Sequence, residues 1–186
     1  IIYIGGAPGT GKSMLATSLA TRLGINKVIS TDSIREIMRL AFSNDLLPTL
    51  FHSTTEAWKG LPMEFQSSEQ LIAGYCLQAN QVSLGVRAVV ERTVEEGENL
   101  IVEGAHLVPF LHEIAKKEMV DAYHIPITLS IMNEKHHRER FSERGTKNLR
   151  KIENFYLERF NEIRSINEYT LTQCETDEVE VFDNED

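Results

Sequence analysis

Cysteine is scarce in this sequence, and long apolar runs are missing from it. The two cysteines, Cys76 and Cys174, lie far apart, with no C-x-x-C pair and no histidines at zinc-finger spacing, which is typical of packing thiols in a reducing compartment. No segment approaches the ~18 consecutive apolar residues that a membrane-spanning helix needs. We therefore expect a cytoplasmic protein that does not enter a membrane.

Broad positive charge is also lacking, because 28 Asp and Glu residues outnumber 19 Lys and Arg residues and give a formal net charge of −9. Seven acidic residues and no basic residue follow position 174: Glu175, Asp177, Glu178, Glu180, Asp183, Glu185 and Asp186. The rest of the chain then carries a formal charge of only −2. An extended nucleic-acid partner is not expected, since such binding depends on neutralising many phosphates. A localised site for a small substrate stays open.

The 186 residues fit a single domain, residues 1–186. Apolar runs of strand length recur at residues 1–5, 27–30, 99–103, 122–131 and 178–182. Apolar residues at helical spacing separate them, at residues 12–23, 31–41, 68–96, 108–118 and 151–171. We predict an α/β fold in which a parallel sheet is sandwiched by helices, with the site in the loops at the carboxyl ends of the strands.

Several details of this organisation remain expectations. Thr31 or Asp32 is expected to cap the second helix, and residues 68–96 are expected to form one bent helix or two. Residues 43–68 carry Pro48, Gly60 and Pro62 and are assigned to loops and short helical turns over the site, so residues 43–97 form a substrate-loop and helical insertion. The start at Ile1, within a strand-like run and without an initiator Met, suggests a chain trimmed from a longer protein.

Residues 6–13 match the Walker A pattern, after a predicted strand and at the start of a predicted helix. Glycines let backbone amides turn toward phosphates, and the helix N-terminus adds partial positive charge. Lys12 is expected to bind the β- and γ-phosphates of ATP, and the Ser13 hydroxyl to ligate Mg²⁺. The predicted cofactor-binding residues are Gly6, Ala7, Pro8, Gly9, Thr10, Gly11, Lys12, Ser13 and Met14. This P-loop context disfavours a glycine-rich turn without a ligand.

Asp32 follows the second predicted strand and should emerge beside the P-loop. A carboxylate there can accept or orient the proton of an acceptor hydroxyl, and it also counts among the expected metal-side residues. Arg35 lies one helical turn later and can clamp an anion. The competing interpretation of Asp32 is a helix N-cap, which is compatible with the catalytic one.

Glu103 ends an apolar strand, where a Walker B acid would stand near Mg²⁺, although Glu replaces the usual Asp. Gly104 permits close approach of the backbone, and His106 follows on the same rim. For Glu103 the alternative is a carboxylate that only faces solvent. For His106 it is a hydrogen-bonded structural histidine.

Residues 133–150 are rich in Lys and Arg. His136, Arg140 and Arg144 recur at i, i+4 and i+8 and give one helical face a positive edge, while Arg138 projects elsewhere. We predict a lid over residues 133–150 whose Arg138, Arg140 and Arg144 stabilise the charge of a transferring phosphoryl group. The alternative is a solvated basic helix paired with neighbouring glutamates.

Four segments of the chain resemble the kinase domain of the 2-phosphoglycerate kinase family: residues 5–13, 28–36, 47–50 and 101–109. The similarity extends nearly end to end. It implies an ATP-dependent kinase of adenylate-kinase or shikimate-kinase architecture that phosphorylates the 3-hydroxyl of 2-phosphoglycerate to give 2,3-bisphosphoglycerate. On matching positions it implies Lys12 and Ser13 for ATP and Mg²⁺, with Asp32, Arg35, Glu103 and His106 lining the reaction centre.

A phosphorylated hydroxy acid needs local cations on an acidic protein. Arg35, Arg87 and the predicted lid are candidates, together with His52 and the hydroxyls of residues 53–55 as neutral donors. The last strand, with residues 181–184, resembles the nucleotide side of such kinases. Such sheets often form homodimers, but no interface signature is visible in the sequence.

The residues alone, without the resemblance, are also compatible with other functions. A polynucleotide 5′-hydroxyl kinase would use Asp32 and Arg35 equally well, and an ATP-binding switch protein would hydrolyse slowly and transmit a conformational change. A degenerate fold retained as a binding module is disfavoured by the presence of Lys12, Ser13, Asp32 and Glu103.

Overall fold

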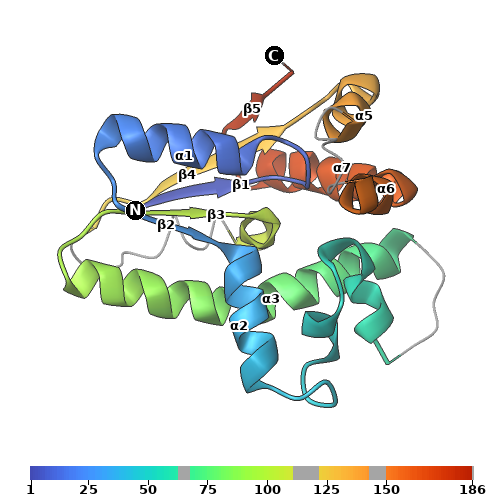
Figure 1. Ribbon diagram of the computed structural model, residues 1–186, viewed down its shortest axis with the longest axis horizontal. Coiled ribbons are helices and arrows are strands. Elements are labelled where there is room, and N and C mark those ends of the chain that lie inside the picture. The colour runs from blue at the N-terminus through green and yellow to red at the C-terminus, as the bar shows by residue number, and fades with distance from the viewer. Residues whose placement is uncertain (63–67, 111–121, 143–149, 186) are drawn as a thin grey trace.

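The computed structural model of the protein describes residues 1–62, 68–110, 122–142 and 150–185. Within them, five parallel strands form one sheet in the order β2-β3-β1-β4-β5 (Figure 1). The strands are β1 (Ile2–Gly5), β2 (Lys27–Ser30), β3 (Leu100–Glu103), β4 (Ile125–Ser130) and β5 (Val181–Asp183). The predicted α/β fold with a parallel sheet is confirmed, and the strand expected over residues 122–131 is shorter than predicted.

Helices connect the strands: α1 (Lys12–Leu23), α2 (Thr31–Ala41), α3 (Ser68–Glu95), α5 (Glu134–Ser142), α6 (Arg150–Glu158) and α7 (Phe160–Thr176). Three 3₁₀ segments join them: η1 (Pro48–Phe51), η2 (Thr54–Gly60) and η3 (Ala105–Phe110). None of the helices in the described ranges is long and apolar enough to cross a membrane.

Three predicted helical segments need comment. The segment predicted as one bent helix or two is the single helix α3, whereas the prediction of one helix over residues 151–171 is wrong, because α6 and α7 meet there at Arg159. The helix expected over residues 108–118 begins in the 3₁₀ segment η3, and its remainder lies outside the described residues.

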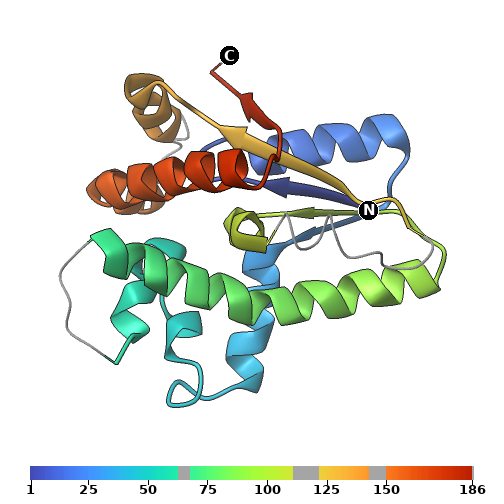
Figure 2. The same cartoon turned by 180° about the vertical axis from the view of Figure 1, so that it is seen from behind.

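The alternation of side chains along the strands builds a core on each face of the sheet. Ile2, Ile4 and Ile101 are buried with Ala16 of α1 in one cluster. Tyr3 and its neighbours in β3 are buried on the other face, against Val82, Val86 and Val90 of α3. Successive residues of a strand point to opposite faces of the sheet, so alternate residues of the same strands supply the two cores. Helices α3 and α7 cover the face opposite α1 (Figure 2).

The start of α2 differs from the prediction in its capping residue. Ser30 has extended backbone angles, and its side chain accepts a hydrogen bond from the Ser33 N–H at 3.0 Å. Ser30, and not Thr31 or Asp32, is therefore the N-cap. The Asp32 side chain is 65% exposed and keeps its carboxylate available for another role.

The acidic C-terminal segment has a local structural role beside β4. The carboxylate of Asp183 accepts a hydrogen bond from the Met132 N–H, and that of Glu185 accepts one from the Asn133 N–H. Asn133 in turn accepts bonds from two N–H groups in the first turn of α5. These contacts fix the chain between β4 and α5, next to the end of β1.

We predict that Gly74→Ala destabilises the protein although it improves helix propensity. Alanine is ordinarily about 1 kcal/mol better than glycine inside a helix, but a Cβ at Gly74 would lie 2.3 Å from backbone atoms of Trp58. Overpacking of this kind costs about 1–3 kcal/mol. Urea unfolding of Gly74→Ala, with Asn80→Ala on the exposed side of α3 as control, measures the difference. An unchanged or increased free energy of unfolding for Gly74→Ala would contradict the described packing of η2 on α3.

Candidate active site

The Walker A residues lie between the carboxyl end of β1 and the start of α1. Gly11 is the N-cap of α1 and has φ of 93°, a left-handed conformation that favours glycine. Lys12 is largely buried, and its Nζ donates a hydrogen bond to the Ala7 carbonyl at 2.7 Å. The N-terminus of α1 therefore lies at the carboxyl end of the central strand β1. The free backbone N–H groups of a helix N-terminus in this position are typical of an anion site.

Glu103 brings a carboxylate to the P-loop from the neighbouring strand. It ends β3, is 8% exposed, and accepts a hydrogen bond from the Ser13 hydroxyl at 3.1 Å. Burial raises the pKa of Glu103 and the charge of Asp32 adds to this, while the Lys12 ammonium and the Ser13 bond oppose it. Glu103 therefore does not face only solvent, and it lies beside Ser13, the other residue predicted on the Mg²⁺ side of the site.

Gly104 allows the two loops to approach. It has φ of 150°, and a Cβ there would lie 1.9 Å from the Thr31 Oγ1. A side chain at position 104 would push the start of α2 away from β3 and carry Asp32 with it.

A pocket of about 290 Å³ opens over the P-loop. It brings together the phosphate loop, the carboxylates and the hydroxyl-bearing residues at the start of η2. Its lining residues are Pro8, Gly9, Gly11, Lys12, Ser13, Met14, Asp32, Arg35, Ser53, Thr54, Thr55, Glu103, Gly104, Ala105, Phe155 and Tyr156. Phe155 and Tyr156 of α6 also line the pocket. They are not predicted as site residues, because nothing in their local sequence pattern distinguishes them from aromatic residues of the core.

Arg35 lines this pocket and also holds its outer wall. Its Nη1 donates to the carbonyls of Leu50, at 2.8 Å, and His52, at 3.2 Å, and its Nε lies 3.8 Å from Asp32. His52 therefore contributes its carbonyl to this network, and its side chain does not line the pocket. Gln78 of α3 donates to the same His52 carbonyl.

His106 lies behind the pocket, where it is 2% exposed. Its Nδ1 is 2.8 Å from the Thr31 hydroxyl, and its Nε2 is 3.0 Å from the Gln78 side-chain oxygen. Burial lowers the pKa of His106 to about 4. These contacts favour the structural interpretation of His106, as the residue that joins α2, α3 and η3 beneath Asp32.

The predicted arginines separate in the structure. Arg140 donates to the carbonyl of Asn184, beside Gly11, whereas the Arg138 guanidinium lies over the Phe160 ring at 4.5 Å. Arg87 is exposed and pairs with Glu91 on α3 at 2.9 Å, away from the pocket. Arg144 and part of the predicted lid lie outside the described residues. Of the four arginines, Arg140 is the one that the described structure places beside the P-loop.

An ion pair that the sequence did not indicate spans the pocket wall. Arg159, between α6 and α7, donates to Glu56 of η2 at 2.9 Å and stacks on Phe155 at 3.9 Å. Burial alone would raise the pKa of Glu56, but hydrogen bonds from Lys59, Arg159 and Ser53 lower it to about 2. Residues 103 positions apart thus hold η2 and α6 together around the pocket.

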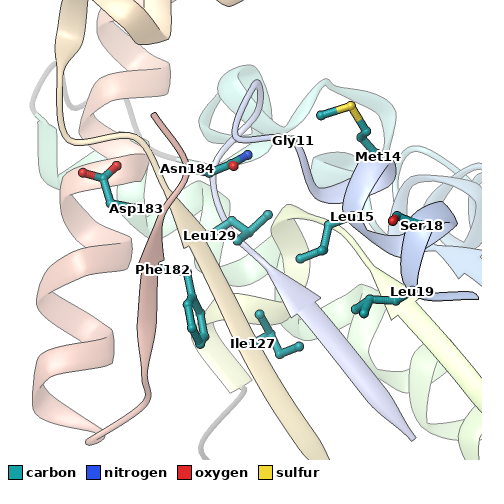
Figure 3. A pocket seen from close by; sticks show the side chains of 10 residues that line it. All are labelled: Gly11, Met14, Leu15, Ser18, Leu19, Ile127, Leu129, Phe182, Asp183 and Asn184. Carbon is teal, nitrogen blue, oxygen red and sulfur yellow. The ribbon is translucent and has the colours of Figure 1, made fainter. Parts of the chain in front are cut away.

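A second, more apolar pocket of about 610 Å³ continues from the P-loop between α1, β4 and β5 (Figure 3). Gly11, Met14 and Asn184 stand at its P-loop end. Its other lining residues are Leu15, Ser18, Leu19, Ile127, Leu129, Phe182 and Asp183. Because Gly11 and Met14 line both pockets, a ligand at the P-loop can extend into this groove.

A family model described as an AAA domain matches residues 2–161. The chain belongs to the AAA domain family. This AAA domain is 41% identical, over 184 residues, to a curated protein of Methanocaldococcus jannaschii named 2-phosphoglycerate kinase; the match covers 99% of this chain and 58% of that relative. Relatives of the same name from Pyrococcus furiosus and Methanopyrus kandleri are 41% and 38% identical, with 99% and 100% of this chain and 59% and 56% of the relatives covered.

The chain therefore spans less than two thirds of the length of the curated relatives that it matches. The predicted resemblance to the 2-phosphoglycerate kinase family is confirmed by the identity over nearly the whole chain.

The two buried histidines of this region predict a pH dependence of stability. Burial lowers the pKa values of His106 and His137 to about 4, whereas an unfolded histidine titrates near 6.5. The unfolded state then binds more protons below pH 6.5, so the free energy of unfolding falls as the pH falls. Between pH 7 and pH 5 the expected loss is about 2 kcal/mol per histidine.

Urea unfolding at pH 7, 6 and 5 measures this slope for the wild type and for His106→Gln. The variant is expected to lack the His106 contribution to this pH dependence, about 2 kcal/mol between pH 7 and pH 5. A wild-type stability that stays level from pH 7 to pH 5 would contradict the burial of both rings.

Proposed function

We propose that this AAA domain is the catalytic part of a kinase that transfers the γ-phosphoryl group of ATP to the 3-hydroxyl of 2-phosphoglycerate, giving 2,3-bisphosphoglycerate. The observation that carries the proposal is the pocket in which the P-loop, the Asp32 carboxylate and the hydroxyls of residues 53–55 face one space. The shared name of the relatives supports the choice of acceptor.

The nucleotide side of the proposal rests on the P-loop and the apolar groove. Lys12 and the backbone amides of residues 9–13 would bind the β- and γ-phosphates. The nucleoside would then lie at the groove end where Met14 and Asn184 stand. A groove that is mostly apolar with a few polar groups suits a purine base.

The residues fit a Mg²⁺ ion, because the Ser13 hydroxyl and the Glu103 carboxylate lie 3.1 Å apart and this ion prefers oxygen ligands. Ser13 would ligate the ion, with Glu103 and Asp32 on the same side of the pocket. No cluster of three or more His, Cys, Asp or Glu side chains suited to a metal occurs among the described residues, so phosphate oxygens and waters would have to complete the coordination. When bound, the ion supplies positive charge that stabilises the transferring group.

Asp32 is the proposed partner of the acceptor hydroxyl. The hydroxyl oxygen forms a bond to the γ-phosphorus while the bond from that phosphorus to the β,γ-bridging oxygen breaks, and ADP leaves. Asp32 orients the hydroxyl and accepts its proton. Arg35 and the hydroxyls of Ser53, Thr54 and Thr55 would hold the anionic groups of the acceptor, and Arg140 would neutralise charge on the nucleotide side.

The test is ADP formation with Mg-ATP in the presence of 2-phosphoglycerate, 3-phosphoglycerate, shikimate, a nucleoside monophosphate or a short 5′-hydroxyl oligonucleotide. We expect selective stimulation by 2-phosphoglycerate, with 2,3-bisphosphoglycerate as product. Stimulation by the oligonucleotide would replace the acceptor by a nucleic-acid end. Turnover that no acceptor increases would favour the ATP-binding switch and contradict the proposed kinase.

We predict that Asp32→Asn lowers kcat by about 10²- to 10⁴-fold, the usual contribution of a general base, while ADP affinity stays unchanged. Ser30 already caps α2, so the loss cannot come from the removal of a cap. Asp45→Asn, on the exposed segment after α2, is the control. Near-normal turnover of Asp32→Asn would remove Asp32 from the mechanism.

A further inference from the structure

Two carbonyl groups of the P-loop accept hydrogen bonds from side chains that come much later in the chain. His137 Nε2 lies 2.8 Å from the Pro8 carbonyl oxygen, and Asn184 Nδ2 donates to the Thr10 carbonyl oxygen at 2.9 Å. In a trans peptide the C=O and the following N–H point in opposite directions. A bond to the Pro8 carbonyl therefore fixes the direction of the Gly9 N–H.

A second contact assigns the proton on the His137 ring. Arg164 of α7 lies with its Nη1 3.3 Å from His137 Nδ1, and the same nitrogen donates to the Ile131 carbonyl at 2.7 Å. A guanidinium can only donate, so Nδ1 must be an acceptor and the proton must be on Nε2. The Pro8 carbonyl can only accept, and the Nε2–H tautomer satisfies both neighbours.

The ring is also fixed by packing. His137 is fully buried, with Phe141 stacked at 5.6 Å and the Phe160 ring edge-on at 5.6 Å. Phe141 reaches the P-loop as well, since a Cβ at Gly9 would lie 2.4 Å from its ring. Burial lowers the pKa of His137 to about 4, so the imidazole is neutral at pH 7. The histidine has neither the exposure nor the charge of a lid residue.

We propose that His137 is a positioning residue for nucleotide binding: its neutral ring, held as the Nε2–H tautomer by Arg164, fixes the peptide between Pro8 and Gly9 so that the Gly9 N–H faces the phosphates. His137 acts through the backbone and does not touch the nucleotide. This role rests on the proposed function, because it requires the P-loop to bind a nucleotide.

The test measures ADP affinity by calorimetry for the wild type and for the variants His137→Gln, His137→Asn and His137→Leu, well below the lowest unfolding midpoint. The Gln side-chain nitrogen reaches the position of His Nε2, whereas Asn is too short and Leu has no donor. We expect His137→Asn and His137→Leu to bind ADP about tenfold more weakly, since an unpaired carbonyl and a misdirected amide remain. His137→Gln should stay within about threefold of the wild type.

The Leu variant separates positioning from packing. If His137 only filled the core, Leu would preserve ADP affinity better than Gln, because Gln loses the contacts with both phenylalanine rings. That order of affinities would overturn the proposal. Glu139→Gln, on the exposed face of α5, is the control for substitution on the same helix.

A measurement on the wild type keeps the proposal falsifiable if the variants do not fold. Nitrogen-15 NMR of the His137 ring at pH 7 should show the neutral Nε2–H tautomer, and the Nδ1–H tautomer or an imidazolium would overturn the proposal.

Because ADP binding needs no acceptor, the failure of the proposed function can be told from the failure of the role of His137. A wild type that binds ADP without phosphorylating any acceptor would contradict the proposed function alone. Wild type that phosphorylates 2-phosphoglycerate while His137→Leu binds ADP normally would contradict the role of His137 alone.

Discussion

The P-loop must turn its N–H groups toward one point while its carbonyl groups still find hydrogen-bond partners. The surrounding structure supplies those partners from different parts of the chain. Lys12 donates to Ala7 from within the loop, and donors from α5 and from the residue after β5 bind the carbonyls of Pro8 and Thr10. Because β1 lies between β3 and β4, the elements after β4 and β5 reach this turn from one side, and Glu103 of β3 reaches it from the other.

Local charge at the site differs from the charge of the whole chain. The net charge is −9, yet Lys12, Arg35 and Arg140 lie around the P-loop and its pockets. The acidic C-terminal residues are partly used as hydrogen-bond acceptors for backbone N–H groups after β4. These two carboxylates therefore stabilise the turn after β4, and they do not line the pocket over the P-loop.

The parts of the fold that depend on local sequence could be predicted. The apolar runs give the strands, and the glycines and Lys12 give the P-loop, because each depends on neighbours within a few positions. Asp32 and Glu103 could be placed at the site because the carboxyl ends of parallel strands meet at one edge. Their exact roles remain predictions.

The parts that depend on distant contacts could not be predicted. Helical spacing placed His136, Arg140 and Arg144 on one face, but it could not show that His137 meets a carbonyl 129 positions earlier. The same limit applies to Arg138. Its position in a basic segment predicts an anion ligand, but in the structure its guanidinium lies over the Phe160 ring. His106 followed a site strand in sequence, and only its three-dimensional neighbours show that it is buried behind the pocket.

The hydrogen bond between Asn184 and Thr10 joins residues 174 positions apart. During synthesis the Walker A segment emerges well before its neighbours β4 and β5. A nascent chain that ends after α3 already contains every residue of the motif, but it lacks both side chains that hold the outer carbonyls. The P-loop can therefore form both of these outer hydrogen bonds only after β5 and Asn184 have been made, and long-range contacts of this kind slow folding.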